Sequence, residues 1–286
     1  GASVSLSSDG TRVAIGATYN DGTGSNAGHV RVYDWTNGAW VQAGSDIDGE
    51  AALDLFGASV SLSSDGTRVA IGATYNDGTG SNAGHVRVYD WTNGAWVQAG
   101  SNIDGAAAND YSGSSVSLSS DGTRVAIGAQ GNDGGGDGSG HVRVYDWTDG
   151  AWVQAGSDID GEATDDNSGS SVSLSSDGTR VAIGAPYNDG GGDGNGHVRV
   201  YDWTNGAWVQ AGSDIDGEAE YDRSGSSVSL SSDGTRVAIG APYNYGNGSS
   251  SGHVRVHSMS TSSPGSTPTP APAPYSGPLL NTYSDR

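Results

Sequence analysis

The sequence predicts an all-β protein made of repeated four-stranded units, and the blades of a β-propeller are the simplest arrangement for them. Three observations support this fold class. The segment Gly1–Phe56 recurs at a constant spacing of 56 residues, each unit contains short alternations of apolar and polar residues, and no stretch has a convincing helical period. Four short antiparallel strands per unit are typical of a propeller blade. An open β-solenoid-like array is the alternative.

The repeat divides the chain into a propeller domain and a C-terminal extension. Residues 1–45 and 57–101 are identical, and the fifth copy ends near Val256. We therefore expect a β-propeller array over residues 1–256, with units at 1–56, 57–112, 113–168, 169–224 and a partial unit at 225–256. A Ser/Thr/Pro-rich linker follows over residues 257–274, and a tail occupies residues 275–286.

Each unit is expected to form four strands joined by short connections. In the first unit the predicted strands are Ala2–Ser7, Thr11–Ala17, His29–Trp35 and Ala39–Ala43. The dipeptides Asp9-Gly10 and Asn37-Gly38 predict tight hairpin turns, the second of type I′. Asp46–Leu55 is interpreted as the connection to the next unit.

Residue size indicates how such units would pack. A single meander cannot bury both faces of its sheet, so it must stack on its neighbours. The small residues Ala14, Gly16 and Ala17 suit inner strands that crowd together, and Trp35 and Trp40 supply bulk between outer strands. The fifth unit has no counterpart of the fourth strand. We therefore expect it to expose a strand edge.

Composition excludes several classes of function. The chain contains 12 Lys+Arg against 33 Asp+Glu, a formal net charge of −21, and all its cations except histidine are arginine. Such acidity disfavours nucleic acid and anionic lipid, because phosphate binding needs clustered cations. Cysteine is absent, which excludes disulfides and thiolate chemistry. No apolar run approaches the roughly 20 residues of a membrane span. The sequence starts at Gly1, inside the repeat pattern, and we interpret this as a processed or incompletely known chain.

Three short motifs recur in order within each unit. In the second unit they are residues 56–60 (FGASV), 69–73 (VAIGA) and 84–89 (GHVRVY), and the fourth unit carries Ala182-Ile183-Gly184-Ala185-Pro186. These motifs resemble the FG-GAP repeat of integrin α-subunit propellers over residues 1–256. The resemblance implies a β-propeller whose relatives serve adhesion, ligand binding and, occasionally, catalysis.

The resemblance also implies a calcium loop in the first hairpin of many family members, and this chain departs from it. The matching stretch, residues 5–12, has hydroxyl side chains at the early ligand positions, and Arg12 stands near the place of the last carboxylate. Calcium needs several hard oxygen ligands, and a neighbouring cation opposes it. We expect this hairpin to be metal-free.

A second acidic stretch, in the connection between units, is a candidate calcium site. Its carboxylates follow the spacing 1, 3, 5, 9 and occur three times: Asp46, Asp48, Glu50, Asp54; Asp158, Asp160, Glu162, Asp166; and Asp214, Asp216, Glu218, Asp222. In the second unit the positions read Asn102, Asp104, Ala106 and Asp110, which loses charge and one ligand. A solvated acidic linker with Asp/Gly turns is the competing interpretation.

Histidine and arginine recur once per unit at fixed positions of the third strand. His29, His85, His141, His197 and His253 are equivalent, and a packed or hydrogen-bonded role is preferred to a metal or pH-sensing role. Arg31 is expected to pair with Asp34 or Asp9, or to stack on aromatic rings. No nucleophile, base and orienting group can be assembled from residues unique to one unit, so we predict no catalytic residues and no enzymatic activity.

The C-terminal extension suggests an extracellular stalk. Its Pro-rich composition favours polyproline II structure and is typical of O-glycosylated segments, with Thr261, Thr267 and Thr269 as candidate sites. Asn247-Gly248-Ser249 is an N-glycosylation pattern in the fifth unit. Leu279, Leu280 and Tyr283 are candidate assembly residues, which would dock on this propeller or on a neighbouring copy.

The leading functional prediction is a non-catalytic extracellular or cell-surface structural or adhesive protein, assembled head to tail as a subunit of a fibre. Expected partners are other copies, extracellular proteins or glycans. The alternative is a recognition propeller that binds carbohydrate or Ca²⁺. Tandem Trp and Tyr residues favour sugar stacking in that reading, although aromatic pairs at blade edges more often serve packing.

Overall fold

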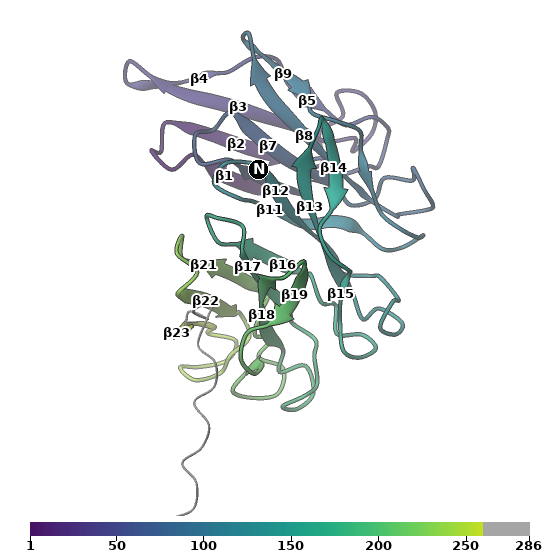
Figure 1. Cartoon of the computed structure of the whole chain (residues 1–286), viewed down its shortest axis with the longest axis vertical. Coiled ribbons are helices and arrows are strands. Elements are labelled where there is room, and N and C mark those ends of the chain that lie inside the picture. The colour runs from purple at the N-terminus through teal and green to yellow at the C-terminus, as the bar shows by residue number, and fades with distance from the viewer. Residues whose placement is uncertain (260–286) are drawn as a thin grey trace, which may run out of the picture.

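The computed structural model describes residues 1–259, and every regular element in that range is a β-strand. Figure 1 shows the strands as a stack of five sheets that runs from the N-terminal unit to the last unit. The strands of units 1 to 3 are β1 Ser3–Leu6, β2 Arg12–Ala17, β3 His29–Thr36, β4 Ala39–Gln42, β5 Ile47–Asp48, β6 Ser59–Leu62, β7 Arg68–Ala73, β8 His85–Thr92, β9 Ala95–Gln98, β10 Ile103–Asp104, β11 Ser112–Leu118, β12 Arg124–Ala129, β13 His141–Thr148, β14 Ala151–Gln154 and β15 Ile159–Asp160. Those of units 4 and 5 are β16 Ser171–Leu174, β17 Arg180–Ala185, β18 His197–Thr204, β19 Ala207–Gln210, β20 Ile215–Asp216, β21 Ser227–Leu230, β22 Arg236–Ala241 and β23 His253–Ser258.

Each complete unit is an antiparallel meander, as the sequence predicts. In the first unit the order is β1-β2-β3-β4, and the corresponding strands of units 2 to 4 follow the same order. Asn37 and Gly38, between β3 and β4, have φ angles of 52° and 83°. Two successive positive φ angles define a type I′ hairpin, so the predicted turn is confirmed.

The connection between units contains a short strand that the sequence analysis did not predict. β5 pairs with the start of β3, in the register His29↔Asp48 and Val30↔Ile47. Ile47 is buried in the core between units, whereas Asp48 is exposed. The connection to the next unit therefore contains regular structure, because burial of Ile47 and the ladder to β3 hold this segment against the sheet.

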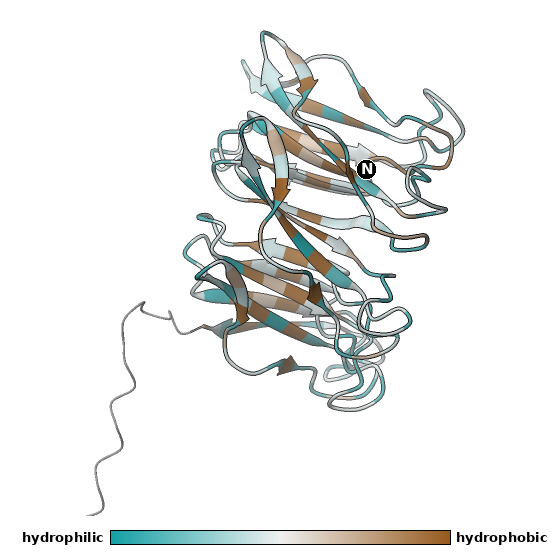
Figure 2. Ribbon diagram, turned by 45° about the vertical axis from the view of Figure 1, so that its right-hand side comes forward, coloured by the Kyte–Doolittle hydropathy of each residue, from teal (hydrophilic) through white to brown (hydrophobic). Residues whose placement is uncertain are grey.

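The hydrophobic core lies between successive sheets and not inside any one of them. Val30 and Val32 of unit 1 share a buried cluster with Val60, Leu62 and Ile71 of unit 2. Equivalent clusters fill the next three junctions. Figure 2 shows the resulting apolar bands within the stacked sheets.

A glycine on each second strand permits the units to approach closely. An added Cβ at Gly16 would lie 2.0 Å from the backbone oxygen of Gly57 in the next unit, and one at Gly72 would lie 2.2 Å from that of Gly113. The predicted crowding at this position is confirmed, because any larger side chain would push the units apart.

The five blades form an open arc. The first strands of successive units, β1, β6, β11, β16 and β21, each pack on the next one, and no extensive packing joins β21 to β1. The fifth sheet has three strands within the described residues, as predicted. Over the described residues the fold is thus a β-propeller array of four complete blades and one three-stranded blade. In the part of the chain that the structure describes, no helix is long and apolar enough to cross a membrane.

Candidate functional site

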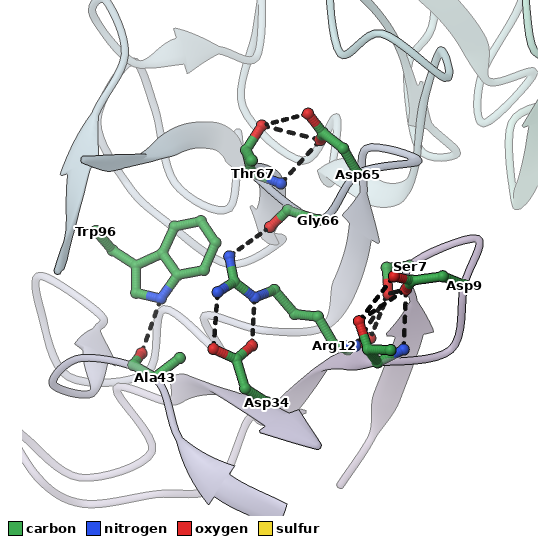
Figure 3. A network of polar contacts seen from close by, with 10 residues as sticks. Ser7, Asp9, Arg12, Asp34, Ala43, Asp65, Gly66, Thr67 and Trp96 are labelled. Atoms are coloured by element: carbon green, nitrogen blue, oxygen red, sulfur yellow. Dashed lines mark hydrogen bonds and ion pairs between the residues drawn. The ribbon is translucent and has the colours of Figure 1, made fainter. Parts of the chain in front are cut away.

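The junctions between units hold most of the polar chemistry of the repeat, and an arginine clamp is the centre of each one. Arg12 faces Asp34 across the β2–β3 ladder and donates two hydrogen bonds to its carboxylate, at 2.5 and 2.8 Å. Its third hydrogen bond, of 3.0 Å, goes to the carbonyl oxygen of Gly66 in the next unit (Figure 3). The guanidinium also lies 5.0 Å from the ring centre of Trp91. One side chain therefore joins two blades by an ion pair, a hydrogen bond and a cation–π contact.

The ion pair and the hydrogen bond to the next unit recur at Arg68, Arg124 and Arg180, with Asp90, Asp146 and Asp202 as ion-pair partners. The tryptophan contact recurs at Arg68 and Arg124. This corrects the predicted partner of Arg31, which pairs with Asp46 at 2.9 Å and not with Asp34 or Asp9. The sequence analysis treated Arg12 only as a cation that opposes calcium. The β2–β3 register was the missing signal, because it places Arg12 directly opposite Asp34.

A ladder of backbone hydrogen bonds joins the first hairpins of successive units. The amide of Ser8 donates to the carbonyl oxygen of Ser64 at 2.9 Å, and Ser64 donates to Ser120 in the same way at 2.8 Å. Ser120 and Ser176 continue the series to Ser232. These hairpins line a shallow hollow of about 360 Å³.

The aspartate of each first hairpin is bound to its own turn. Asp9 accepts hydrogen bonds from the Ser7 hydroxyl at 2.7 Å and from the Thr11 amide at 2.9 Å. In the fifth unit, hydrogen bonds from the Ser231 hydroxyl and the Thr235 amide lower the pKa of Asp233 to about 2. The stretch that matches the family's calcium hairpin thus has its carboxylate committed to turn contacts.

The four carboxylates of the first acidic connection do not converge on one point. Asp46 accepts hydrogen bonds from Arg31, Glu50 lies 3.3 Å from Arg87 of the next unit, and Asp54 caps the backbone amide of Ala51. Asp54 also accepts a hydrogen bond of 3.1 Å from the Asn76 side chain in the next unit. Within the described residues, the carboxylates of this acidic connection therefore contact separate cations and amides and do not form one shared site.

The other two acidic connections are divided in the same way. Asp158 pairs with Arg143, and Glu162 and Asp214 both contact Arg199. Glu218 contacts His253 and Arg255. Asp166 and Asp222 accept hydrogen bonds from Asn188 and Asn244, as Asp54 does from Asn76. Asp160 and Asp216 lie opposite His141 and His197 in the β-ladder.

Two of the predicted carboxylates do come together, and they do so around a histidine. His29, Asp46 and Asp48 present ligand atoms within 4.8 Å of one another, as do His141, Asp158 and Asp160, and likewise Glu162, His197 and Asp214. The register explains this grouping, since His29 lies opposite Asp48 in the ladder. One imidazole and two carboxylates are a possible ligand set for a divalent ion. The arginine beside each carboxylate competes with such an ion.

The histidines of the inner units are buried and neutral in character. Burial lowers the pKa of His85 to about 4, and it also lowers the pKa of His141 and of His197. The Arg31 hydrogen bond lowers the pKa of Asp46. In the His141 cluster, burial disfavours protonation of the imidazole, and a hydrogen bond from Arg143 lowers the pKa of Asp158. An unprotonated imidazole beside an ionised carboxylate can act as a metal ligand.

A groove lined by acidic and aromatic residues runs beside the His29 cluster, and an equivalent groove lies at the next junction. Asp46, Asp48, Tyr89 and Trp96 line a hollow of about 380 Å³ between units 1 and 2. Its counterpart between units 2 and 3, of about 350 Å³, is lined by Asn102, Asp104, Tyr145 and Trp152. The indole N–H of Trp96 donates to the carbonyl oxygen of Ala43 at 3.0 Å, so this ring also serves packing.

The remaining predicted sites belong to the C-terminal part. Asn247 lies in an exposed loop of the fifth unit. Thr261, Thr267, Thr269, Leu279, Leu280 and Tyr283 lie outside the described residues.

Comparison with known proteins identifies the repeat. The sequence model described as "FG-GAP repeat" matches residues 46–89 and 214–256. A search of curated protein sequences gives no significant match. Among solved structures, the periplasmic gluconolactonase PpgL of Pseudomonas aeruginosa is similar, with a TM-score of 0.53 and 17% identity. That alignment covers 83% of this chain and 64% of the other, so the chain spans less than two thirds of that protein.

A putative 6-phosphogluconolactonase of Bacteroides uniformis is also similar, with a TM-score of 0.47 and 13% identity over 83% of this chain and 77% of the other. The likeness to PpgL corrects the prediction that the chain is not an enzyme. A protein named as a gluconolactonase shares the fold. The absence of a catalytic set in the repeat pattern is therefore no ground for excluding activity. At this level of identity the likeness shows the fold alone, and the family model identifies FG-GAP repeats at the two matched stretches.

Proposed function

We propose that the chain is a structural or adhesive module of the cell exterior, in which FG-GAP units form a stiff arc that assembles with further copies. The supporting observation is the junction itself. The arginine clamp, the serine ladder and the apolar cluster are repeated from unit to unit, and they commit the recurring side chains to joining blades. A surface built to join identical units suits assembly.

The acidic composition and the C-terminal extension support a place outside the cytoplasm. A net charge of −21 keeps separate molecules soluble, and exposed Asn247 lies in an acceptor pattern for glycosylation. Partners that fit this surface are other copies of the chain, and extracellular proteins or glycans of neutral or positive charge.

Electron microscopy of the full chain over a range of concentrations tests this proposal. We expect ordered, end-to-end assemblies whose number grows with concentration. Particles that stay single at every concentration would contradict it. Salt should be varied in the same series, because screening of the like charges favours association of acidic molecules.

Recognition of a sugar or a cation is a second candidate, and the groove beside the His29 cluster favours it. Carboxylates next to Tyr89 and Trp96 combine hydrogen-bond acceptors with aromatic surface. Calorimetric titration with CaCl₂, with ZnCl₂ and with a panel of neutral oligosaccharides checks this candidate. Asp48→Asn is the informative variant, because Asp48 lines the groove and belongs to the cluster. Equal heats for both proteins would count against a site there.

A further inference from the structure

We propose that the loops around Arg223 form a binding site for a neutral saccharide. The site is a hollow of about 500 Å³ between units 3 and 4, and its lining includes Asp165, Tyr187, Asp193, Tyr221 and Arg223. This inference deepens the second candidate function, because it assigns saccharide recognition to a hollow other than the groove beside the His29 cluster. It does not depend on assembly of the chain.

The loops that form this hollow are held together by backbone hydrogen bonds. Tyr187 and Asp193 lie in the loop between β17 and β18, and Tyr221 and Arg223 lie in the connection that follows β20. The amide of Tyr221 donates to the carbonyl oxygen of Asp193 at 2.8 Å, and the amide of Arg223 donates to that of Gly194 at 3.2 Å. The lining residues are therefore fixed relative to one another, which lowers the entropy cost of binding.

Arg223 is the residue that points most directly to a ligand. Its guanidinium carbon lies 4.6 Å from the ring centre of Tyr187 and 4.7 Å from that of Tyr243. Within residues 1–259, no hydrogen bond or ion pair engages this guanidinium. An arginine has five N–H donors in a planar fork, and contacts with ring faces leave these donors available. The two rings thus hold a half-buried set of donors in place, without a protein acceptor for it.

Half-exposed tyrosine rings give the hollow an apolar surface. Tyr187 and Tyr221 are 41% and 57% exposed. Tyr75, which has the position of Tyr187 in unit 2, is 43% exposed, so this exposure is a property of the loop and is the same in another inner unit. An exposed ring offers apolar area to the C–H groups of a sugar ring, and its hydroxyl group remains available for polar contacts.

The polar groups of the hollow have both signs of charge, and this selects the class of ligand. Asp165, Asp189 and Asp193 contribute three carboxylates beside the one guanidinium. An anion is repelled by these carboxylates and by the net charge of −21, and a cation is repelled by Arg223. Hydroxyl groups both donate and accept hydrogen bonds, so a saccharide can use the guanidinium and the carboxylates together.

Acceptor capacity remains on the carboxylates of the hollow. Asp193 accepts a hydrogen bond of 3.2 Å from the Tyr221 hydroxyl, and Asp189 accepts one of 2.6 Å from the amide of Gly194. A carboxylate has about four acceptor positions, so each of the two can accept further hydrogen bonds. The hollow therefore combines free donors, free acceptors and apolar rings, which is the combination that a neutral saccharide needs.

The residue at the centre of this site distinguishes unit 4 from the units before it. At the position of Arg223 the preceding units have Leu55, Tyr111 and Asn167. In unit 2, Tyr111 packs edge-on against Tyr75 with ring centres 5.3 Å apart, so two rings meet where unit 4 has an arginine and a ring. The sequence of β17 is by contrast the same as that of its four counterparts. The site therefore belongs to the loops around unit 4 and not to the repeat as a whole.

Replacement of lining residues by their unit 2 counterparts tests the site in the full-length chain. Arg223→Tyr installs the residue found at Tyr111, and Tyr221→Asn installs the one found at Asn109. The φ angles of Tyr111 and Asn109, 54° and 65°, match the 52° and 65° of Arg223 and Tyr221. Both variants should therefore fold, which far-UV circular dichroism checks.

Tyr187→Ala and Tyr75→Ala form a matched pair, because the same ring is removed from the same loop position in two units. The probes are cellohexaose, maltohexaose, mannohexaose and N-acetylchitohexaose, with hexagalacturonate as the acidic comparison. Saturation-transfer-difference NMR detects contact between protein rings and the C–H protons of the sugar, and isothermal titration calorimetry measures the affinity.

We expect at least one of the neutral oligosaccharides to bind the wild type and Tyr75→Ala equally well. Arg223→Tyr should weaken this binding at least ~10-fold, because hydrogen bonds from a charged donor are lost. Tyr187→Ala and Tyr221→Asn should each weaken it at least ~3-fold through loss of ring contacts.

Several results would overturn the inference. One is the absence of binding by all four neutral oligosaccharides, and another is equal affinity for the wild type and Arg223→Tyr. Tighter binding of hexagalacturonate than of any neutral probe would contradict the charge argument. Loss of binding in Tyr75→Ala but not in Tyr187→Ala would place the sugar at another junction.

Failure of this site and failure of the other proposals give different results. Loss of binding in Asp48→Asn, with Arg223→Tyr unaffected, would assign the sugar to the groove beside the His29 cluster, and the second candidate function would then stand without this site. Chains that bind the sugar through Arg223 but stay single in electron microscopy would remove the proposed assembly and support this site.

Discussion

Replacement of one clamp arginine should lower the free energy of unfolding by the sum of the contacts that this side chain makes. Arg68 donates two hydrogen bonds to Asp90, at 2.6 and 2.9 Å, and one of 2.9 Å to the carbonyl oxygen of Gly122 in the next unit. Its guanidinium lies 4.9 Å from the ring centre of Trp147. The side chain is mostly buried, whereas Asp90 is more than a third exposed.

The size of the loss follows from these contacts taken one at a time. A hydrogen bond from a charged donor to Gly122 contributes about 1.5–3 kcal/mol. The cation–π contact adds about 0.5–1 kcal/mol, and the ion pair with half-exposed Asp90 adds at most about 1 kcal/mol. Arg68→Ala should therefore lower the free energy of unfolding by about 2–5 kcal/mol. Arg68→Lys keeps the charge but loses the planar fork, so about half of that loss is expected.

Urea unfolding followed by tryptophan fluorescence measures the effect, and Arg236→Ala is the control. Arg236 has the same place in its unit but no described partner for its guanidinium, so its replacement should change stability by less than about 0.5 kcal/mol at dilutions where the chain is monomeric. In a repeat array the loss acts on the coupling between neighbouring units, and the transition of Arg68→Ala should also broaden. Equal losses for Arg68→Ala and Arg236→Ala would refute the clamp.

Two further predictions concern backbone strain and pH. Leu53 is exposed and has a φ of 71°, and the equivalent residue of unit 2 is Asn109, with a φ of 65°. Because Asn tolerates this left-handed conformation better than Leu, Leu53→Asn should raise the free energy of unfolding by about 1 kcal/mol. Asn109→Leu should lower it by a similar amount, and urea titrations measure both changes. His85 has its pKa lowered to about 4 by burial, against 6.5 when exposed, so the unfolded state binds more protons between these values. The free energy of unfolding should therefore keep its full His85 contribution above pH 6.5 and decrease as the pH is lowered from 6.5 toward 4. A His85 ring that titrates near pH 6.5 by NMR would contradict this.

Local pattern was sufficient to predict most strands and the main turn. The alternation in Arg12–Ala17 and the Asn37-Gly38 dipeptide depend on residues that are close together in the chain. Such local patterns can be recognised in a single sequence. The two-residue strand β5 was missed because it is too short to show a period. It exists because Ile47 is buried and because its ladder partner, Val30, lies 17 residues earlier in the chain.

The candidate site was predicted less well because its groups come from different units. Spacing suggested that Asp46, Asp48, Glu50 and Asp54 form one loop, but their partners lie on other strands and in the next blade. Charge alone does not show which arginine approaches which carboxylate. A register argument would have found the Arg12–Asp34 pair and the His29–Asp48 pair, since both are direct cross-strand neighbours.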